Sequence, residues 1–103
     1  LLFSLMLSLN SLGETIYCSY IMKNGEINLF DYRRDGDTFT RNNRFKNNDI
    51  LFEDDEYLTL IEPLSSGAVG MFFYDKVSGD FRSGLYSSIK FRSEDFGKCS
   101  VTN

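Results

Sequence analysis

Residues 15–26 read TIYCSYIMKNGE. The first eight are rich in β-branched and aromatic side chains, which favour a strand. The segment 23–26 (KNGE) is the strongest short hairpin signal, because asparagine and glycine tolerate the positive φ angles of a tight turn. A two-residue loop at this point places Tyr20 opposite Leu29 on the returning strand. The chain is therefore expected to fold back here as an antiparallel hairpin.

A second hairpin is expected in residues 69–82, which read VGMFFYDKVSGDFR. Residues 75–79 (DKVSG) have the composition of a type I turn closed by a glycine with positive φ. This turn joins a strand over Val69–Tyr74 to a strand over Phe81–Ile89. The sequence thus predicts two hairpins far apart in the chain.

Further turn signals punctuate the chain at short, regular intervals, at residues 34–37, 54–56 and 65–67. Pro63 ends the strand before the last of these turns, because proline cannot donate to a strand ladder. Such spacing is typical of an all-β sandwich or small antiparallel barrel, here with about eight strands. The last strand contains Cys99.

Large apolar side chains in these strands supply the expected core, namely Phe30, Phe52, Leu60, Phe72, Tyr74 and Phe81. In the register above, Tyr17, Phe30 and Tyr32 fall on the face opposite to Tyr20 and Leu29. Aromatic residues on both faces imply a covered outer layer, a ligand groove or a partner surface, because exposed aromatic patches mark interaction sites.

The first nine residues, LLFSLMLSL, contain no charge. They are too few for a membrane-spanning helix, which needs about 20 residues, and they match the apolar centre of a secretory signal peptide. Ser11 and Gly13 are small residues at the two positions that signal peptidase reads. We expect 1–13 to be a signal peptide truncated at its start and 14–103 to be one mature domain. A buried N-terminal helix is the alternative.

Processing before Glu14 has consequences for the location of the protein. A lipoprotein signal would place a cysteine at that position, so we expect no stable membrane anchor after cleavage. The expected location is periplasmic or secreted.

Cys18 and Cys99 are the only cysteines of the chain, one near each end of the mature domain. Because an exported chain meets an oxidising compartment, we expect them to form a disulfide. Closing a loop of this size stabilises by about 4 to 5 kcal/mol at most. The alternatives are two free thiols or a metal site, but two thiolates without any histidine make a poor zinc site. We expect neither a metal nor a cofactor.

Catalysis is disfavoured by composition. The chain has no histidine, which removes the commonest general base and the usual serine and cysteine triads. The acidic run 53–56 lacks the glycine and spacing of a calcium loop and is expected to form an exposed turn. An enzyme would need paired carboxylates, such as Glu53 and Glu62, about 5 to 9 Å apart.

The charge pattern argues against nucleic acid. Five basic residues cluster in one region, namely Arg33, Arg34, Arg41, Arg44 and Lys46. The net charge of the chain is nevertheless −4, whereas nucleic-acid-binding domains are generally basic as a whole. We expect these residues to form a solvated strand edge, or at most a polyanion contact.

Three segments carry a resemblance to known proteins. Ile16-Tyr17-Cys18 follows the signal peptide, residues 73–81 form the second hairpin, and residues 97–99 (GKC) close the chain. This arrangement resembles a group of small uncharacterised exported proteins from marine bacteria. The resemblance covers most of the mature domain and implies a fold rather than an activity.

The chain is also similar, more weakly, to the C-type lysozyme inhibitors of the bacterial envelope. Those proteins are small eight-stranded barrels with bonded terminal cysteines, and they present a Ser-Gly loop and a lysine to the catalytic cleft of the enzyme. The similarity implies a partner contact at Ser65, Ser66 and Gly67, with Lys76 beside it. Val69-Gly70 stands where that family continues with tyrosine, and this chain contains no tryptophan.

These observations leave three classes of function. A binding or inhibitory module fits the size, the expected disulfide and the missing catalytic residues. A structural component of the cell envelope would show an apolar patch, and an enzyme would need a cleft with paired carboxylates. The partner is expected to be an unknown protein or envelope component, not nucleic acid.

Overall fold

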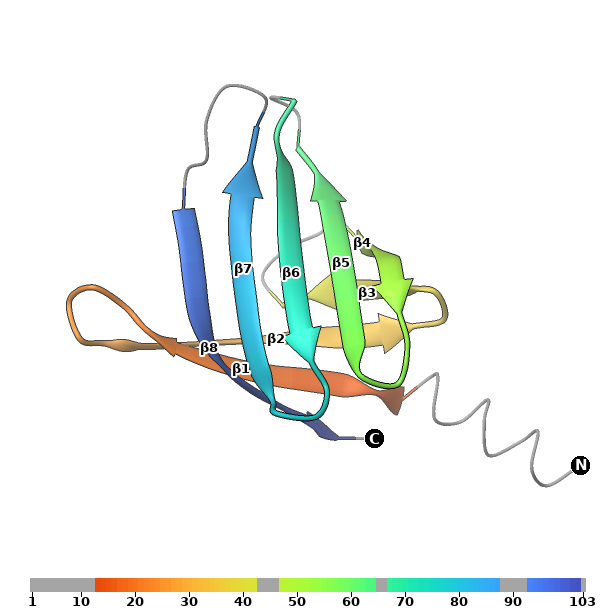
Figure 1. The fold of residues 1–103 in the computed structure, drawn as a ribbon, viewed down its shortest axis with the longest axis horizontal. Coiled ribbons are helices and arrows are strands. Elements are labelled where there is room, and N and C mark those ends of the chain that lie inside the picture. Colours follow the sequence, from red (N-terminus) through yellow and green to blue (C-terminus); the bar gives the residue numbers. More distant parts are fainter. Residues whose placement is uncertain (1–12, 43–46, 65–66, 88–92, 103) are drawn as a thin grey trace, which may run out of the picture.

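The computed structural model describes residues 13–42, 47–64, 67–87 and 93–102. The described residues form an all-β domain whose strands are β1 (Thr15–Ile21), β2 (Ile27–Asp35), β3 (Thr38–Arg41), β4 (Asn47–Glu53), β5 (Tyr57–Pro63), β6 (Val69–Asp75), β7 (Asp80–Tyr86) and β8 (Ser93–Thr102). Each strand pairs antiparallel with the next, and β1 also pairs with β8, so the sheet closes into a barrel (Figure 1). The all-β prediction is confirmed, and the barrel replaces the sandwich alternative. Pro63 ends β5 as expected.

The two ends of the chain meet at the β1–β8 seam. Cys18 lies directly opposite Cys99, with 4.1 Å between their Cα atoms, and the two residues form a disulfide. In Figure 1, β5, β6 and β7 stand side by side, while β1 and β2 cross beneath them. The predicted disulfide is therefore confirmed, and it fastens the strand that closes the barrel to the strand that opens it. Within the described ranges, no helix is long and apolar enough to cross a membrane.

The hairpin between β1 and β2 forms where the sequence predicts it, but its register is shifted by one residue. Tyr20 lies opposite Asn28, not Leu29. The loop has three residues rather than two, with the N–H of Gly25 donating to the carbonyl of Met22 and a φ of 88° at Gly25. Such loops place a left-handed glycine at the end of a type I turn. A slip of one residue exchanges the two faces of a strand, so Tyr20 packs against the core and Leu29 is exposed.

The hairpin between β6 and β7 has its turn where the sequence predicts it, while Ile89, the predicted end of its second strand, lies outside the described residues. Gly79 has a φ of 84°, and its N–H donates to the carbonyl of Asp75 at 2.9 Å. The Asp75 carboxylate accepts the N–H groups of Val77 and Ser78, which caps the turn from the inside. The predicted turns at 34–37 and 54–56 also connect strands.

Aromatic rings from β2, β6 and β7 pack against one another across the interior of the barrel. Phe30 packs edge-on against Phe81 at 5.3 Å between centroids, and Phe72 lies 4.6 Å from Tyr32. Such ring pairs add about 0.5 to 1.5 kcal/mol each to the burial of their surface. Phe30 and Tyr32 therefore share the interior with Tyr20, contrary to the predicted face assignment.

A β-bulge in β4 overturns one predicted core residue. The register with β5 shifts between Ile50 and Phe52, which leaves Leu51 as the extra residue. Bulges re-aim the side chains that follow them. Phe52 consequently points outward with half of its surface exposed, and Glu53 turns inward instead. The other five predicted core residues are buried.

Candidate functional site

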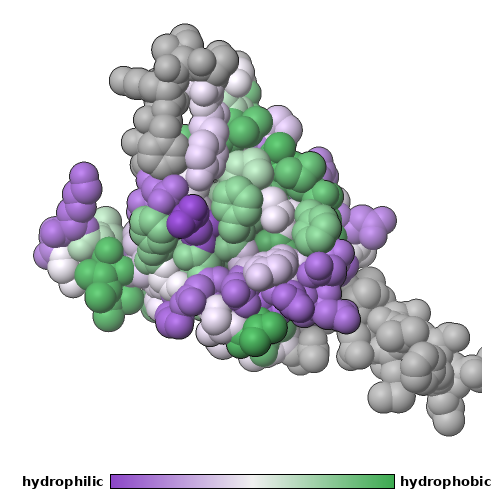
Figure 2. Space-filling model, viewed as in Figure 1, coloured by the Kyte–Doolittle hydropathy of each residue, from purple (hydrophilic) through white to green (hydrophobic). Residues whose placement is uncertain are grey.

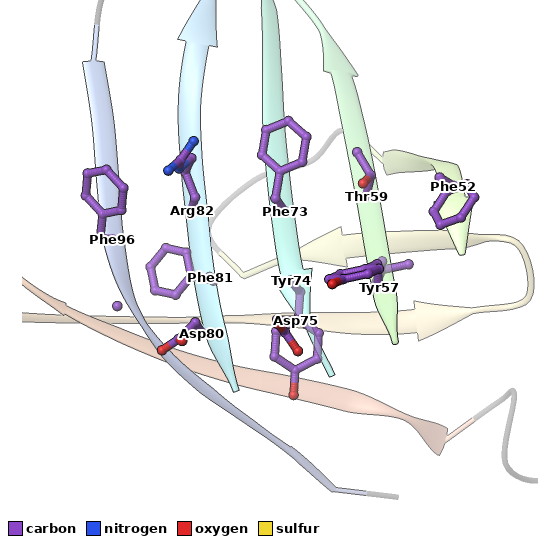
Figure 3. A pocket seen from close by; sticks show the side chains of 12 residues that line it. Phe52, Tyr57, Thr59, Phe73, Tyr74, Asp75, Asp80, Phe81, Arg82 and Phe96 are labelled. Atoms are coloured by element: carbon purple, nitrogen blue, oxygen red, sulfur yellow. The ribbon is translucent and has the colours of Figure 1, made fainter. Parts of the chain in front are cut away.

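Five outward-facing side chains form one line across the barrel wall, one from each of the strands β4 to β8. Phe52 is opposite Thr59, Thr59 is opposite Phe73, Phe73 is opposite Arg82, and Arg82 is opposite Phe96. We call these five residues the aromatic row. Figure 3 shows them side by side across the strands, with three phenylalanine rings separated by the smaller or more flexible Thr59 and Arg82.

The aromatic row is open to solvent. Phe52 is 51% exposed, Phe73 36% and Phe96 56%. Tyr57, itself about half exposed, lies below the row on β5. Together they line a shallow groove of about 730 Å³. Figure 2 shows hydrophobic side chains gathered over this face, with hydrophilic residues along its lower border.

Charged groups flank the aromatic row on both sides. Above it, Glu94 Oε1 lies 3.7 Å from Arg82 Nε, and the Arg82 guanidinium sits 5.2 Å from the centre of the Phe96 ring. Below it, Asp80 forms an ion pair with Lys98, and the hydrogen bond from that lysine lowers the pKa of the Asp80 carboxyl. Each of these two carboxylates is thus paired with a cation, Glu94 with Arg82 and Asp80 with Lys98.

A second charged cluster closes the lower end of the barrel. Arg34 makes two hydrogen bonds of 2.9 Å to the two oxygens of Glu53 and one of 3.2 Å to Glu14. Lys76 Nζ adds a 3.0 Å contact to Glu53 and a 2.7 Å bond to the carbonyl of Asp54. The Arg34 guanidinium therefore binds the Glu53 carboxylate in a bidentate manner, and such a pair is stronger than one with a single hydrogen bond.

The cluster shifts the ionisation of its members. The hydrogen bonds from Arg34, then those from Lys76, lower the pKa of Glu53, against an opposing effect of burial. The hydrogen bond to Glu53 raises the pKa of Arg34. Burial raises the pKa of the neighbouring Tyr74 phenol, with smaller contributions from nearby carboxylates. Glu53 is therefore held as a carboxylate and is poorly suited to donate a proton at neutral pH.

Glu53 and Glu62, the carboxylates named above as an example of a catalytic pair, are not brought together. Glu53 pairs with Leu58, whereas Glu62 lies four residues further along β5. At about 3.3 Å per residue, the two positions are about 13 Å apart. Among the residues that the structure describes, no group of three Cys, Asp or Glu side chains converges as a metal-ligand set.

Two members of the predicted basic edge point into the barrel instead. The Arg34 guanidinium lies 5.4 Å from the centre of the buried Phe39 ring, and that of Arg41 lies 4.4 Å from the Phe30 ring. Cations over buried rings are attracted by the ring quadrupole. Among the described members, only Arg33 faces solvent. Arg44 and Lys46 lie outside the described residues. The prediction of one solvated basic edge is therefore wrong for Arg34 and Arg41.

Of the four residues predicted for partner contact, the structure describes Gly67 and Lys76, and it does not bring these two together. Ser65 and Ser66 lie outside the described residues, and Gly67 is exposed with a φ of 81°. Gly67 precedes β6 and Lys76 follows it, so the two are separated by roughly 23 Å of strand. Lys76 is also engaged by Glu53 and by the carbonyl of Asp54.

The aromatic row itself was not predicted from the sequence. Its members lie on five strands, and their alignment depends on four pairings that no local pattern specifies. The available signal was the surplus of aromatic residues on both faces of the strands.

Comparison with known proteins gives no assignment. No family model matches the chain, and no match to it was found among the curated proteins or the solved structures. The two resemblances stated above therefore remain expectations, and function has to be inferred from the geometry.

Proposed function

We propose that this chain is an exported domain that binds a partner protein through the aromatic row and performs no catalysis. The observation that carries the proposal is the line of exposed rings around a central arginine. Aromatic residues and arginine are the residue types enriched at protein interfaces, and they supply most of the binding energy there. Soluble monomers rarely expose contiguous apolar patches, so a line of exposed rings indicates an interaction site.

The scaffold suits a binding surface. All five members of the aromatic row lie on strands of a closed barrel, which holds side chains more firmly than loops do. The disulfide belongs to an oxidising, extracytoplasmic environment. We further propose that residues 1–13 are a signal peptide and that the mature domain works in the periplasm or outside the cell.

The two alternative functions receive less support. An inhibitor acting through Gly67 and Lys76 would need these residues in one surface, and they lie at opposite ends of β6. A structural role in the envelope would use the same apolar face, so it differs from the proposal only in the identity of the partner.

The proposal is tested by affinity capture from an extract of the parent cell envelope, followed by direct binding of the captured partner in purified form. Replacing both Phe73 and Phe96 by serine is expected to weaken that direct binding at least tenfold. The variant Phe96→Ser alone should weaken it less, because Phe73 still flanks Arg82 on one side, whereas the double variant removes both flanking rings.

The matched control replaces Ile21 and Ile27, which are exposed at the far end of the β1–β2 hairpin. The double serine variant at these positions should bind like the wild type, and thermal unfolding should confirm that every variant is folded. Equal binding by the control and the row variant, or loss only in the control, would place the interface elsewhere.

A further inference from the structure

We propose that the ligand of the aromatic row is a proline-rich segment in the polyproline II conformation that carries basic residues. This inference rests on the proposed function above and names the chemistry of the partner segment. It follows from the spacing of the rings, the closure of the sheet and the charges along the groove.

The spacing of the rings is the first argument. Phe52, Phe73 and Phe96 lie on alternate strands, β4, β6 and β8, in one line across the sheet (Figure 3). Neighbouring strands are about 4.8 Å apart, so successive ring positions are about 9.6 Å apart along the wall. A polyproline II helix has three residues per turn and rises about 3.1 Å per residue, which repeats the same face every ~9.3 Å. Every third residue of such a segment would therefore lie next to a successive ring of the aromatic row.

An extended β-segment fits this spacing less well. Its side chains return to the same face every ~6.6 Å, which does not match the interval between rings. It would also need an unpaired strand edge for its backbone hydrogen bonds. Every strand of this barrel pairs on both sides, including β1 with β8. A polyproline II segment needs no such edge, because its recognition depends on aromatic grooves.

The charges of the groove favour a basic ligand. Asp80 and Glu94 are already paired with Lys98 and Arg82, so the remaining acidic charge of the groove lining comes from Asp75, below the aromatic row. The turn that precedes Tyr57 adds the exposed carboxylates of residues 54–56. With a net charge of −4 for the whole chain, the field around the groove attracts lysine or arginine side chains that flank the prolines.

The length of the aromatic row sets the size of the segment. Four strand intervals span about 19 Å, which corresponds to roughly six residues of polyproline II at ~3.1 Å each. So short a contact belongs to the small, transient class of interfaces. We expect a dissociation constant on the order of 10 to 100 μM for one segment, with tighter binding only where the partner repeats it.

The experiment is an amide NMR titration of the protein with synthetic ten-residue peptides. The first peptide repeats proline-proline-lysine. The second repeats glycine-glycine-lysine, which keeps the charge but loses the rigid conformation. The third repeats proline-proline-glutamate, which keeps the conformation but reverses the charge. An amphipathic helical peptide with the same number of lysines and a hexamer of N-acetylglucosamine represent the other classes of ligand.

The first peptide is expected to shift the amides of Thr59, Phe73, Arg82 and Phe96, and the second and third to bind at least tenfold more weakly. Binding of the first peptide should also weaken as salt is raised from 50 to 500 mM, because salt screens exposed charges. Phe73→Ser should reduce its affinity at least tenfold. The control Leu29→Ser, at an exposed position outside the aromatic row, should leave it unchanged.

The inference is overturned if the glycine peptide binds as tightly as the proline peptide, if the helical peptide or the glycan binds the row more tightly, or if no peptide binds at 2 mM. Shifts confined to other strands also overturn it. If the row variant nevertheless loses its purified envelope partner, the proposed function stands and only the ligand class is wrong. If neither the peptide nor the partner depends on the aromatic row, both proposals fail.

Discussion

Gly97 lies on β8 close to the backbone of Ser19 on β1. A Cβ atom added there would collide with the carbonyl oxygen of Ser19 and come within 2.6 Å of the Phe81 ring. Neither neighbour can give way easily, because one is backbone and the other is a buried core ring. The absence of a side chain at this single position therefore lets the barrel close.

We predict that Gly97→Ala lowers the free energy of unfolding by about 3 kcal/mol, since overpacking at a rigid contact forces backbone shifts. The matched control is Gly70→Ala, where the added atom would meet its neighbours at ordinary distances of 3.6 to 3.7 Å. Its cost should stay below about 1 kcal/mol, because Gly70 has no positive φ that alanine would strain. Urea denaturation measures both, and equal costs at the two sites would contradict the steric account.

The ionised form of Glu53 contributes to the stability of the fold. Its pKa is lowered in the folded state, mainly by Arg34. As the pH falls, the unfolded chain takes up the proton first, near the ordinary value of about 4.3. The stabilisation from Glu53 is therefore present above that pH and is lost as the pH falls through the lower folded value.

We predict that Glu53→Gln costs about 1 to 2 kcal/mol at pH 7, a figure reduced because the side chain is about a quarter exposed. At pH 3 the difference from the wild type should shrink, because the wild-type carboxylate is then also being neutralised. The control Glu56→Gln, in the adjacent exposed turn, should change little at either pH. Denaturant unfolding at the two pH values gives the comparison, and a difference that grows towards acid would reverse the sign argued here.

Among the strand pairs, the β1–β8 seam joins the two ends of the barrel. Its register runs from Thr15 opposite Thr102 to Ser19 opposite Lys98, and the disulfide lies within it. The bond spans a sequence separation of 81 residues. In the chain-entropy model, a loop of this length restricts the unfolded chain by about 4.5 kcal/mol, an upper figure.

We predict that replacing Cys18 and Cys99 together by alanine lowers the free energy of unfolding by about 3 to 4 kcal/mol. Reduction of the wild type should have a similar effect, and reduction of the double variant should have none. A mass measurement without reductant checks the bond itself. Two thiols that react with an alkylating reagent in the native, oxidised protein would refute it.

The hairpins show how far sequence reasoning reaches for such elements. The turns at 23–26 and 75–79 are recognisable in the sequence because Asn, Asp and Gly have local backbone preferences for turns. The register of the first hairpin depends on whether its loop has two or three residues, and both loops accept the same residues. One residue of uncertainty there was enough to assign Tyr20 and Leu29 to the wrong faces.

The bulge in β4 left no such signal. Residues 50–52 are all large and apolar, and strict alternation would bury Phe52 and expose only Leu51. The pairing with β5 instead leaves both Leu51 and Phe52 exposed. The aromatic row needs that bulge as well as three further pairings. The core was largely predictable because burial follows composition, whereas the site was not, because it depends on long-range register.

At the scale of the whole molecule, the barrel begins at Glu14. The carbonyl of Glu14 accepts the N–H of Arg34, its carboxylate contacts the Arg34 guanidinium, and β1 starts at the next residue. All strands found among the described residues, and the disulfide, therefore lie on the C-terminal side of Gly13. A cut after Gly13 would leave each of these contacts in place, which suits the proposed signal peptide.

We predict that the chain, expressed behind a complete signal-peptide start, is cleaved between Gly13 and Glu14. N-terminal sequencing of the exported material should then read Glu-Thr-Ile-Tyr, as in residues 14–17. Gly13→Tyr places a large ring at the position that signal peptidase requires to be small, so this variant should remain unprocessed. Asn10→Tyr, three residues earlier and outside the two positions that the peptidase reads, is the control and should be cleaved normally. Exported wild-type protein that retains Leu1 would show that the apolar segment is not a cleaved leader.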